Sequence, residues 1–571
     1  MNFAAIEHRP VSEYCHGLDE NYIVYRLRCA RGDLERVTLS YGDTACRVTP
    51  IIFTPVEMEL AASDEFHDYW QAVVESKYYR VYYYFTLFGV DGGWTYYYGG
   101  EFTKELVDDR SEYFKLPINH RADIARVPDW ARDAVVYNVF PDSFATGAKR
   151  ISGEGGRLEY NGHAVRSRLG GTLDGVAANA AYIRGMGFNC VYLNPIFAAG
   201  EYHKYDTVDY MHVDPCLGGD EAMRRMVKAL HAEGIRVMID GVFNHCGWHF
   251  WAFEDVVKNQ ERSRYCDWFY GLTFPVERPA DPEAYPTYTT YAYERMMPKL
   301  NTANSEVRDY LCGVGQYWIE EFGVDGWRLD VASEVDDGFW RAFRAAVKAV
   351  KQDALLVGEV WETARHWLDG DMFDPTMNYD FRRHCRRFFA EGTLDAHGFA
   401  ARCTGMLMRY KLQMTGVQMN LLDSHDVSRF LSVCGGDKRR YKLAVLFLMS
   451  FVGMPMLFYG DELGIEGIAE LDYRSPMPWG GGDAELRDFV RCAITLRHER
   501  AELRRGDFRV ISAESGSELF IFERRYGGKT VIVCLNASDE AVRTEAGGKV
   551  LWSEGFMNGV LAPWGFAVLE K

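Results

Sequence analysis

The sequence predicts an α/β protein built around a (β/α)8 TIM barrel, with an insertion after the third strand and a β-sandwich domain at each end. Short aromatic strands fill the first part of the chain, buried apolar runs alternate with amphipathic helices through the middle, and short strands return after Gly506. A chain of 571 residues is also too long for one ordinary hydrophobic core, so we expect about three domains.

Residues 1–121 predict the N-terminal β-sandwich. The segments YIVYRLRC and RVTLSYGD have the composition of strands, and Gly42 and Asp43 are interpreted as a turn at the end of the second segment. Two aromatic strands follow, YYRVYYYFTLF and GGWTYYYGG, with a turn at Asp91–Gly93 between them. No long helical pattern interrupts these strands.

Residues 122–503 predict the barrel. Near-continuous apolar runs recur along this region, as parallel strands require when both faces of the sheet are covered. Eight β/α units over roughly 380 residues fit a TIM barrel with insertions. The eight runs are AVVYNVF, NCVYLNPIF, IRVMIDGVF, VDGWRLDV, ALLVGEVW, TMNYDF, QMNLLD and MPMLFYG.

Amphipathic helices separate the strands, for example EAMRRMVKALHAEG and VRDYLCGVGQYWIEEFG. The insertion covers about residues 246–303, where the sequence is aromatic, contains proline and has no clean periodicity. The barrel ends near the helix RDFVRCAITLRHE. Residues 504–571 then carry the strands LFIFERR, TVIVCLN and GFAVLE, which predict the C-terminal β-sandwich.

Composition limits the partners. The net charge is −18, the pI is about 5.4, and no run of Lys and Arg is present, which argues against nucleic acid and anionic membranes. The first residues lack the pattern of a signal peptide, and no apolar run is long enough to span a bilayer. The 13 cysteines are scattered without a C-x-x-C pair, as in reducing compartments, so we expect a cytoplasmic protein.

Polar side chains follow four of the predicted strands, at the barrel mouth where the chemistry of this fold takes place. Carboxylates crowded at one mouth suit glycoside hydrolysis, in which one carboxylate attacks the anomeric carbon and a second protonates the leaving oxygen. The segments are DGVFNH, GWRLDVASE, GEVW and LLDSHD.

In order and spacing, these four segments resemble the signature regions of the α-amylase family, glycoside hydrolase family 13. The resemblance implies that Asp330 is the nucleophile and Glu359 the general acid/base. It also implies that Asp426 is a third carboxylate that binds sugar hydroxyls at subsite −1.

The same resemblance assigns supporting roles. Arg328 would pair with and orient the nucleophile, and His245 and His425 would bond to the −1 sugar. Asn244 would support the loop, and Asp240 would be a structural carboxylate beneath the site.

Further motifs extend the resemblance. In HKYDTVDY, Tyr205 would be the stacking platform at −1 with His203 beside it, and Asp206 would form a salt bridge with Arg429 that closes the site. Trp361 is interpreted either as a core residue or as a second platform.

The segments MPKLN and VASE resemble the neopullulanase, cyclomaltodextrinase and maltogenic amylase group, and place Glu334 on the acceptor side. The N-terminal module would then be of the starch-binding type. Ser333 and Glu362 depart from the common pattern, which leaves the linkage preference open.

The resemblance implies a retaining hydrolase of α-1,4 bonds, and of some α-1,6 bonds, in maltodextrins, cyclodextrins or pullulan. The alternatives are a glucanotransferase of the same fold and a non-catalytic α-glucan-binding protein. No cofactor is required, the metal content is left unknown, and calcium is compatible with the pattern although no D-x-D-x-D-G loop is present. A homodimer is compatible with the group.

Overall fold

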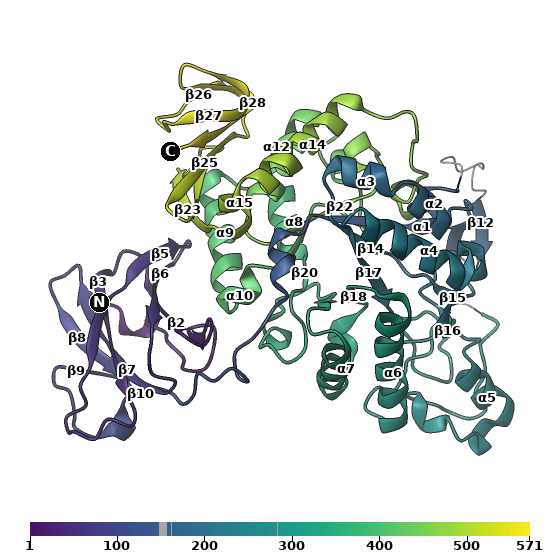
Figure 1. The fold of residues 1–571 in the computed structure, drawn as a ribbon, viewed down its shortest axis with the longest axis horizontal. Coiled ribbons are helices and arrows are strands. Elements are labelled where there is room, and N and C mark those ends of the chain that lie inside the picture. Colours follow the sequence, from purple (N-terminus) through teal and green to yellow (C-terminus); the bar gives the residue numbers. More distant parts are fainter. Residues whose placement is uncertain (148–156, 161–162, 282–283) are drawn as a thin grey trace.

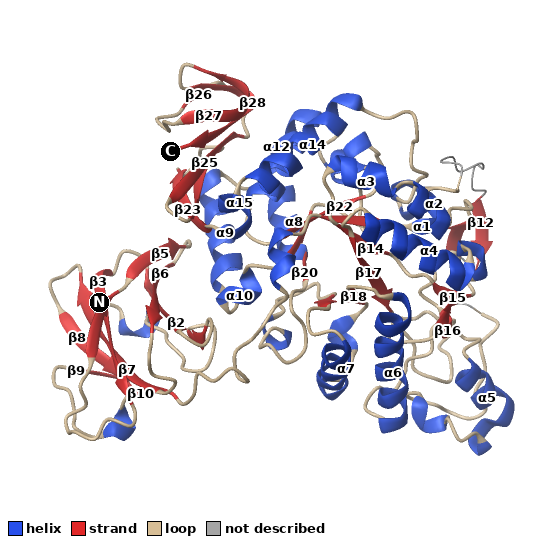
Figure 2. Ribbon diagram, viewed as in Figure 1, coloured by secondary structure: helices blue, strands red, loops and turns tan. Residues whose placement is uncertain are grey.

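The chain is described here from a computed structural model, which describes residues 1–147, 157–160, 163–281 and 284–571. The predicted fold class is confirmed: along the chain, a parallel barrel follows one antiparallel β domain and precedes another, and both β domains lie on the left of the barrel in Figures 1 and 2. In Figure 1 the N-terminal domain lies at the lower left, and the C-terminal domain lies above the N-terminal domain at the upper left.

The barrel has eight parallel strands in the order β19-β18-β17-β14-β11-β22-β21-β20. A parallel bridge between Gly358 and Thr376 joins the two ends of this order and closes the barrel. Each of the eight predicted apolar runs contains one strand. The strands are β11 (Val136–Val139), β14 (Cys190–Leu193), β17 (Arg236–Gly241), β18 (Gly326–Leu329), β19 (Leu355–Gly358), β20 (Met377–Asn378), β21 (Met419–Leu421) and β22 (Met454–Phe458).

The helices cover the outside of this barrel (Figure 2). The sequence sets their ends: α6 begins after Asn304, whose side chain accepts hydrogen bonds from two backbone N–H groups, and ends at Gly323, which has a φ of 74°. The longer helices are α4 (Gly219–Ala232), α6 (Ser305–Phe322), α7 (Asp337–Val350), α9 (Ala396–Met408), α12 (Lys438–Ser450) and α14 (Ala484–Glu499). The shorter ones are α1 (Pro141–Phe144), α2 (Leu173–Ala178), α3 (Ala180–Met186), α8 (Tyr379–Cys385), α10 (Leu412–Thr415), α11 (Phe430–Val433), α13 (Glu470–Tyr473) and α15 (Ala501–Arg505).

Three excursions leave the barrel. The hairpin of β12 (Arg157–Tyr160) and β13 (His163–Arg166) follows β11, and the hairpin of β15 (Phe197–Ala199) and β16 (Thr207–Val213) follows β14. The insertion after β17 contains α5 (Trp251–Asn259) and returns to the barrel at Lys299, which pairs with His245 in an isolated β-bridge.

The N-terminal domain has two sheets, with the orders β1-β2-β6-β5 and β4-β3-β7-β8-β9, and β10 pairs with β7. The predicted turn at Gly42 and Asp43 is wrong: both residues continue the ladder of β3 with β7, opposite Tyr82 and Val81, so the chain turns only after them. The strands are β1 (Cys15–Gly17), β2 (Tyr22–Ala30), β3 (Leu34–Asp43), β4 (Thr54–Glu57), β5 (Glu59–Ser63), β6 (His67–Glu75), β7 (Val81–Gly89), β8 (Trp94–Tyr98), β9 (Glu101–Thr103) and β10 (Phe114–Leu116).

The C-terminal domain is an antiparallel sheet of six strands in the order β23-β24-β25-β28-β26, with β27 paired to β28. Phe520 and Phe522 face the main hydrophobic core, whereas Ile521 and Ile532 form a separate small cluster. The strands are β23 (Asp507–Ala513), β24 (Leu519–Tyr526), β25 (Lys529–Asn536), β26 (Val542–Arg543), β27 (Lys549–Met557) and β28 (Val560–Glu570).

The N-terminal domain is bonded to the barrel. Arg26 is buried and donates through Nη1 to the carbonyl oxygens of Tyr410, at 2.8 Å, and Met408, at 3.4 Å. Thr404 of α9 donates to the carbonyl oxygen of Ser63 at 2.9 Å. The end of the β5–β6 hairpin therefore lies beside α9, as Figure 1 shows. Among the helices of the described residues, none is long and apolar enough to cross a membrane.

Candidate active site

A cavity of about 530 Å³ lies at the carboxyl ends of the barrel strands. Because the strands are parallel, the loops after β14, β17, β18, β19, β21 and β22 all end at this mouth. The three residues predicted to be catalytic, Asp330, Glu359 and Asp426, lie together in its wall.

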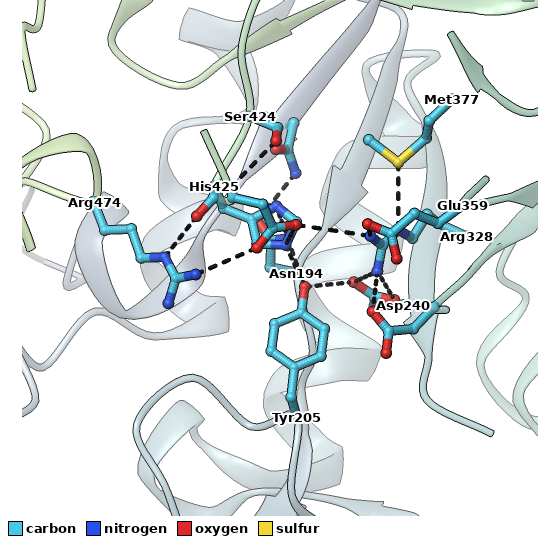
Figure 3. A network of polar contacts seen from close by, with 12 residues as sticks. Asn194, Tyr205, Asp240, Arg328, Glu359, Met377, Ser424, His425 and Arg474 are labelled. Carbon is cyan, nitrogen blue, oxygen red and sulfur yellow. Dashed lines mark hydrogen bonds and ion pairs between the residues drawn. The ribbon is translucent and has the colours of Figure 1, made fainter. Parts of the chain in front are cut away.

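Arg328 on β18 holds the carboxylates together (Figure 3). Its side chain is fully buried, and Nη1 contacts Asp240 Oδ1 at 2.9 Å and Asp330 Oδ1 at 2.7 Å. Nη2 lies 2.6 Å from Glu359 Oε1 and 3.9 Å from Asp426 Oδ2. The predicted nucleophile and the predicted acid/base therefore contact the two ends of one guanidinium, and Asp240 supports it from below.

Glu359 has further donors around its carboxylate. The backbone N–H of Val331 donates to Glu359 Oε2 at 2.9 Å, and the indole of Trp361 donates to Oε1 at 3.2 Å. Val331 has a φ of 44°, which is strained for a β-branched residue. Val331 directly follows Asp330, so this backbone conformation directs the N–H group next to Asp330 towards the carboxylate of Glu359.

Asp426 is held by polar contacts with His425 and Arg474, which Figure 3 labels together with Asn194. Asn194 donates to His425 Nδ1 at 2.8 Å, which leaves the ring proton on Nε2, 2.8 Å from Asp426 Oδ2. Arg474 lies 3.4 Å from Asp426 Oδ1. These contacts keep Asp426 ionised: although burial opposes its charge, His425, Arg474 and Arg328 lower its pKa far below the usual value.

The site holds more negative than positive charge. Four carboxylates meet around Arg328, and burial raises the pKa of Asp330 well above its ordinary value, with Glu359, Asp240 and Asp426 adding to the shift and Arg328 opposing it. Burial and the neighbouring charges therefore determine how readily Asp330 ionises.

Two histidines line the cavity as neutral groups. Burial lowers the pKa of His203 and of His245 to about 3. His245 Nε2 has no hydrogen-bond partner within the described residues, so it is available to a ligand. Tyr205 lies beside them and turns its hydroxyl towards Asp240 Oδ2 at 3.1 Å, with its ring parallel to that of His425.

Lys299, from the MPKLN segment, connects two of the loops. Its Nζ donates to Asn244 Oδ1 and to the carbonyl oxygen of Glu334 at 3.0 Å, and lies 3.4 Å from Glu334 Oε2. Asn244 and Glu334 are thus both held by this lysine, and Glu334 also lines the cavity.

Trp361 lines the cavity, with 45% of its surface exposed. Its ring stacks on that of Tyr379 with centroids 3.8 Å apart and an interplanar angle of 11°. Of the two interpretations, Trp361 therefore fits an aromatic surface of the cavity wall and not a residue of the hydrophobic core.

The predicted salt bridge between Asp206 and Arg429 is wrong. Arg429 pairs with Asp461 at 2.8 Å beneath the site, while Asp206 accepts hydrogen bonds from the backbone N–H groups of Gly200 and Glu201. Burial raises the pKa of Asp206 to about 7. Each side chain has a nearer partner in its own part of the barrel, so Asp206 holds the β15–β16 turn.

His425, predicted to bond to the −1 sugar, is fully buried, and its Nε2 contacts Asp426 Oδ2 and the hydroxyl of Tyr205. In this structure it positions Asp426, and its bond to a sugar stays a prediction.

Sequence reasoning missed Glu470 and Arg474, which line the cavity after β22. They form an ion pair at 2.6 Å, and Arg474 also donates to the carbonyl oxygen of His425 at 2.8 Å. The signal was present, since Glu470 begins α13, Arg474 directly follows this helix, and both come after the eighth strand. Tyr291, whose ring stacks on that of His245, had no comparable signal because it lies in the insertion.

The described residues contain no group of three or more His, Cys, Asp or Glu side chains that could hold a metal ion. The carboxylates of the cavity pair with Arg328 and Arg474. One carboxylate beside the cavity can attack an electrophilic carbon while another delivers a proton, which is the chemistry of glycosidic bond cleavage.

Comparison with known proteins gives the same result over nearly the whole chain. Residues 138–495 match the catalytic domain of α-amylase, and residues 1–120 match the N-terminal Ig-like domain of α-amylase. The chain is 41% identical to a cyclomaltodextrinase of Geobacillus thermopakistaniensis, covering 95% of this chain and 92% of that protein. It is 39% identical to neopullulanase 2 of Thermoactinomyces vulgaris, covering 96% and 94%. A solved cyclomaltodextrinase structure superposes with a TM-score of 0.90 at 35% identity, covering 100% of this chain and 98% of that one.

Proposed function

The chain belongs to the α-amylase family, and from that premise we propose that it cleaves α-glucosidic bonds by double displacement, with Asp330 as nucleophile and Glu359 as acid/base. It is a glycoside hydrolase of the cyclomaltodextrinase, neopullulanase and maltogenic amylase type. Its substrates are α-1,4-linked maltodextrins and cyclodextrins, and it also acts on α-1,6 bonds such as those of pullulan.

One observation carries the assignment of the two residues. Arg328 contacts Asp330 Oδ1 and Glu359 Oε1 from opposite nitrogens of one guanidinium. This arrangement keeps both carboxyl groups beside the same cavity, where they can act on one glycosidic bond.

In the first step, Asp330 attacks the anomeric carbon while Glu359 transfers its proton to the glycosidic oxygen. The carbon–oxygen bond to the leaving sugar breaks, and a β-glycosyl ester of Asp330 forms. Asp426, held ionised by His425 and Arg474, accepts hydrogen bonds from sugar hydroxyls at the same subsite. The surrounding carboxylates stabilise the positive charge that develops on the sugar ring.

In the second step, Glu359 removes a proton from water, and the resulting oxygen attacks the anomeric carbon. The ester breaks, Asp330 leaves as a carboxylate, and the configuration of the substrate is retained. Both steps use only side chains of this chain, so we propose that no cofactor is required and assign no residue to calcium.

The substrate class is tested by initial rates on β-cyclodextrin, pullulan, maltotriose and soluble starch. Fast opening of the cyclodextrin with slow attack on starch is the expected result. Faster attack on starch than on the cyclodextrin contradicts the assignment to this group, and products longer than the substrate indicate glucanotransferase activity. Binding of all four without release of reducing sugar indicates a non-catalytic binding protein.

The role of Asp330 is tested by Asp330→Asn. The variant lacks the attacking carboxylate, so turnover of maltotriose falls by about 10⁴-fold or more while binding is largely kept. The matched control is Asp337→Asn, an acidic residue at the start of α7 that is outside the cavity wall. Near-normal turnover in the Asp330 variant refutes the assignment.

We further propose a cytoplasmic homodimer. The 13 cysteines are all free thiols, as expected in a reducing compartment, and the N-terminal domain exposes apolar side chains such as Ile52 (71%) and Tyr79 (56%) that a partner would cover. Light scattering gives twice the chain mass of 65.4 kDa for a dimer, and a monomer at working concentration contradicts it.

A further inference from the structure

A second cavity, of about 580 Å³, lies beside the active site, between the N-terminal domain and the barrel. One wall is the β5–β6 turn of the N-terminal domain, residues 64–67, and the opposite wall comes from α8 and α9. Trp361 lines both this cavity and the active site, so the two spaces share a wall.

The position of Trp361 relates this cavity to the reaction. Its indole donates to Glu359 Oε1, and Glu359 delivers the proton to the leaving oxygen in the proposed mechanism. The leaving group therefore lies on the side of Glu359 and Trp361. A chain of sugars that continued beyond the leaving oxygen would pass the exposed ring of Trp361 towards the second cavity.

The walls of the second cavity suit a neutral polyhydroxylated ligand. Phe66 is 66% exposed and provides a second aromatic surface in the lining, besides Trp361. Aromatic faces pack against the C–H faces of sugar rings. The charges nearly balance: the lining acids are Asp64, Glu65, Glu362 and Asp380, and the lining arginines are Arg383, Arg402 and Arg409.

Several polar groups of these walls have spare hydrogen-bonding capacity. Within the described part of the chain, the side chains of Glu65, Glu362 and Arg402 make no hydrogen bond or ion pair. His384 on α8 is 8% exposed, and its Nδ1 has no hydrogen-bond partner among the same residues. Burial lowers the pKa of His384 to about 4, so its ring is neutral. Sugar hydroxyls can both donate to and accept from such groups.

We propose that this cavity is the leaving-group extension of the active site, which binds further α-linked glucose units, with Phe66 of the chain's own N-terminal domain as the distal platform. This inference rests on the proposed function. The volume falls within the range of about 300–1,000 Å³ that is typical of small-molecule sites. The N-terminal domain then forms part of the substrate site in a single chain, before any dimer forms.

The first experiment compares Phe66→Ala with wild type on two substrates. Maltohexaose reaches the second cavity, whereas nitrophenyl α-maltoside has a leaving group that ends at Trp361. Loss of one stacking surface lowers kcat/KM for maltohexaose by about 5- to 10-fold, mainly through KM, and leaves nitrophenyl α-maltoside unchanged. Tyr526→Ala, an exposed aromatic residue of the C-terminal domain, is the matched control and changes neither substrate.

The second experiment measures binding without turnover, by titrating maltohexaose into full-length Asp330→Asn with and without Arg402→Gln. Weaker binding of maltohexaose, with maltose binding unchanged, supports the extension. Equal effects on both sugars, or no effect on either, overturn it. If the wild-type chain cleaves none of the α-glucans, the proposed function fails, and this titration still decides whether the cavity binds them.

Discussion

At the scale of single residues, the buried Arg328 is a cation that pairs with the carboxylates of the site. Its guanidinium is fully buried and contacts Asp240, Asp330 and Glu359 within 3 Å. Buried carboxylates without such a partner are costly, because their charge loses hydration without compensation. The attraction of Arg328 opposes the mutual repulsion of the carboxylates and fixes their spacing.

This electrostatic coupling predicts a shift in the pH dependence of Glu359→Gln. Glu359 is one of the charges that raise the pKa of Asp330, and Asp330 must be ionised to attack. Activity is lost as the pH falls through that raised pKa, so removing the charge of Glu359 moves the acid limb of kcat/KM to lower pH. The measurement uses nitrophenyl α-maltoside, whose leaving group needs little protonation; with maltotriose, kcat falls by about 10²–10⁴-fold.

Glu362→Gln is the control, because it removes a nearby negative charge without touching Asp330 or Arg328. Its acid limb stays in place. An unchanged or raised acid limb in Glu359→Gln would show that the charge of Glu359 does not raise the pKa of Asp330.

The sequence predicted the location of residues well where they directly follow a strand. Asp330, Glu359 and Asp426 lie together in one cavity, as predicted, because the carboxyl ends of parallel strands meet at one mouth. The pairing of Asp206 with Arg429 was wrong because a buried arginine takes its nearest acceptor, and the fold places Asp461 there. Which carboxylate a buried arginine pairs with depends on tertiary packing, and the spacing of residues along the chain does not reveal it.

At the scale of elements, helix ends position the loops that form the cavity. Asn304 caps α6, and its side chain accepts from Glu306 N at 2.8 Å and from Val307 N at 3.4 Å. This cap lies directly after the MPKLN segment, which supplies Lys299 to the site.

Removal of this cap predicts a loss of stability. Asn304→Ala lowers the free energy of unfolding by about 1 kcal/mol, because two backbone N–H groups lose their acceptor. The midpoint of urea denaturation measures the change. Asn304→Asp, which keeps an accepting oxygen, is the control and retains the wild-type midpoint; equal midpoints for all three proteins would contradict the capping role.

The barrel strands were predictable because each is a continuous apolar run, which only a sheet covered on both faces requires. The β15–β16 hairpin was not predicted, although it carries His203 and Tyr205 between its strands. It is short and polar, and its position depends on contacts with Asp206 and Asp214. Local composition therefore predicted the strands of the barrel but not the structure of the loops between them.

At the scale of the whole molecule, the N-terminal domain and the barrel are joined by buried polar contacts. Arg26 reaches across the boundary to two carbonyl oxygens of the barrel and also donates to Gln71 within its own domain at 2.6 Å. The proposed extension of the active site lies at the same boundary, so its shape depends on this attachment.

Arg26→Met is expected to loosen the two domains. Each buried carbonyl oxygen that loses its donor costs about 1–3 kcal/mol, so the N-terminal domain unfolds at lower temperature than the barrel in a calorimetric scan. Arg36→Met changes an exposed arginine of the same domain and leaves the scan unaltered. A single unshifted transition for Arg26→Met would mean that other contacts hold the domains together.

The left-handed backbone of Val331 sets thermal stability against the rate of turnover. A valine at a φ of 44° costs of order 1–3 kcal/mol, which glycine at the same position would largely recover. Laboratory evolution for heat resistance alone would therefore favour Val331→Gly. The same change frees the backbone that aims an N–H group at Glu359 beside Asp330, so the hardier protein would turn over its substrate more slowly. At position 331, selection for heat resistance and selection for catalytic rate would therefore favour different residues.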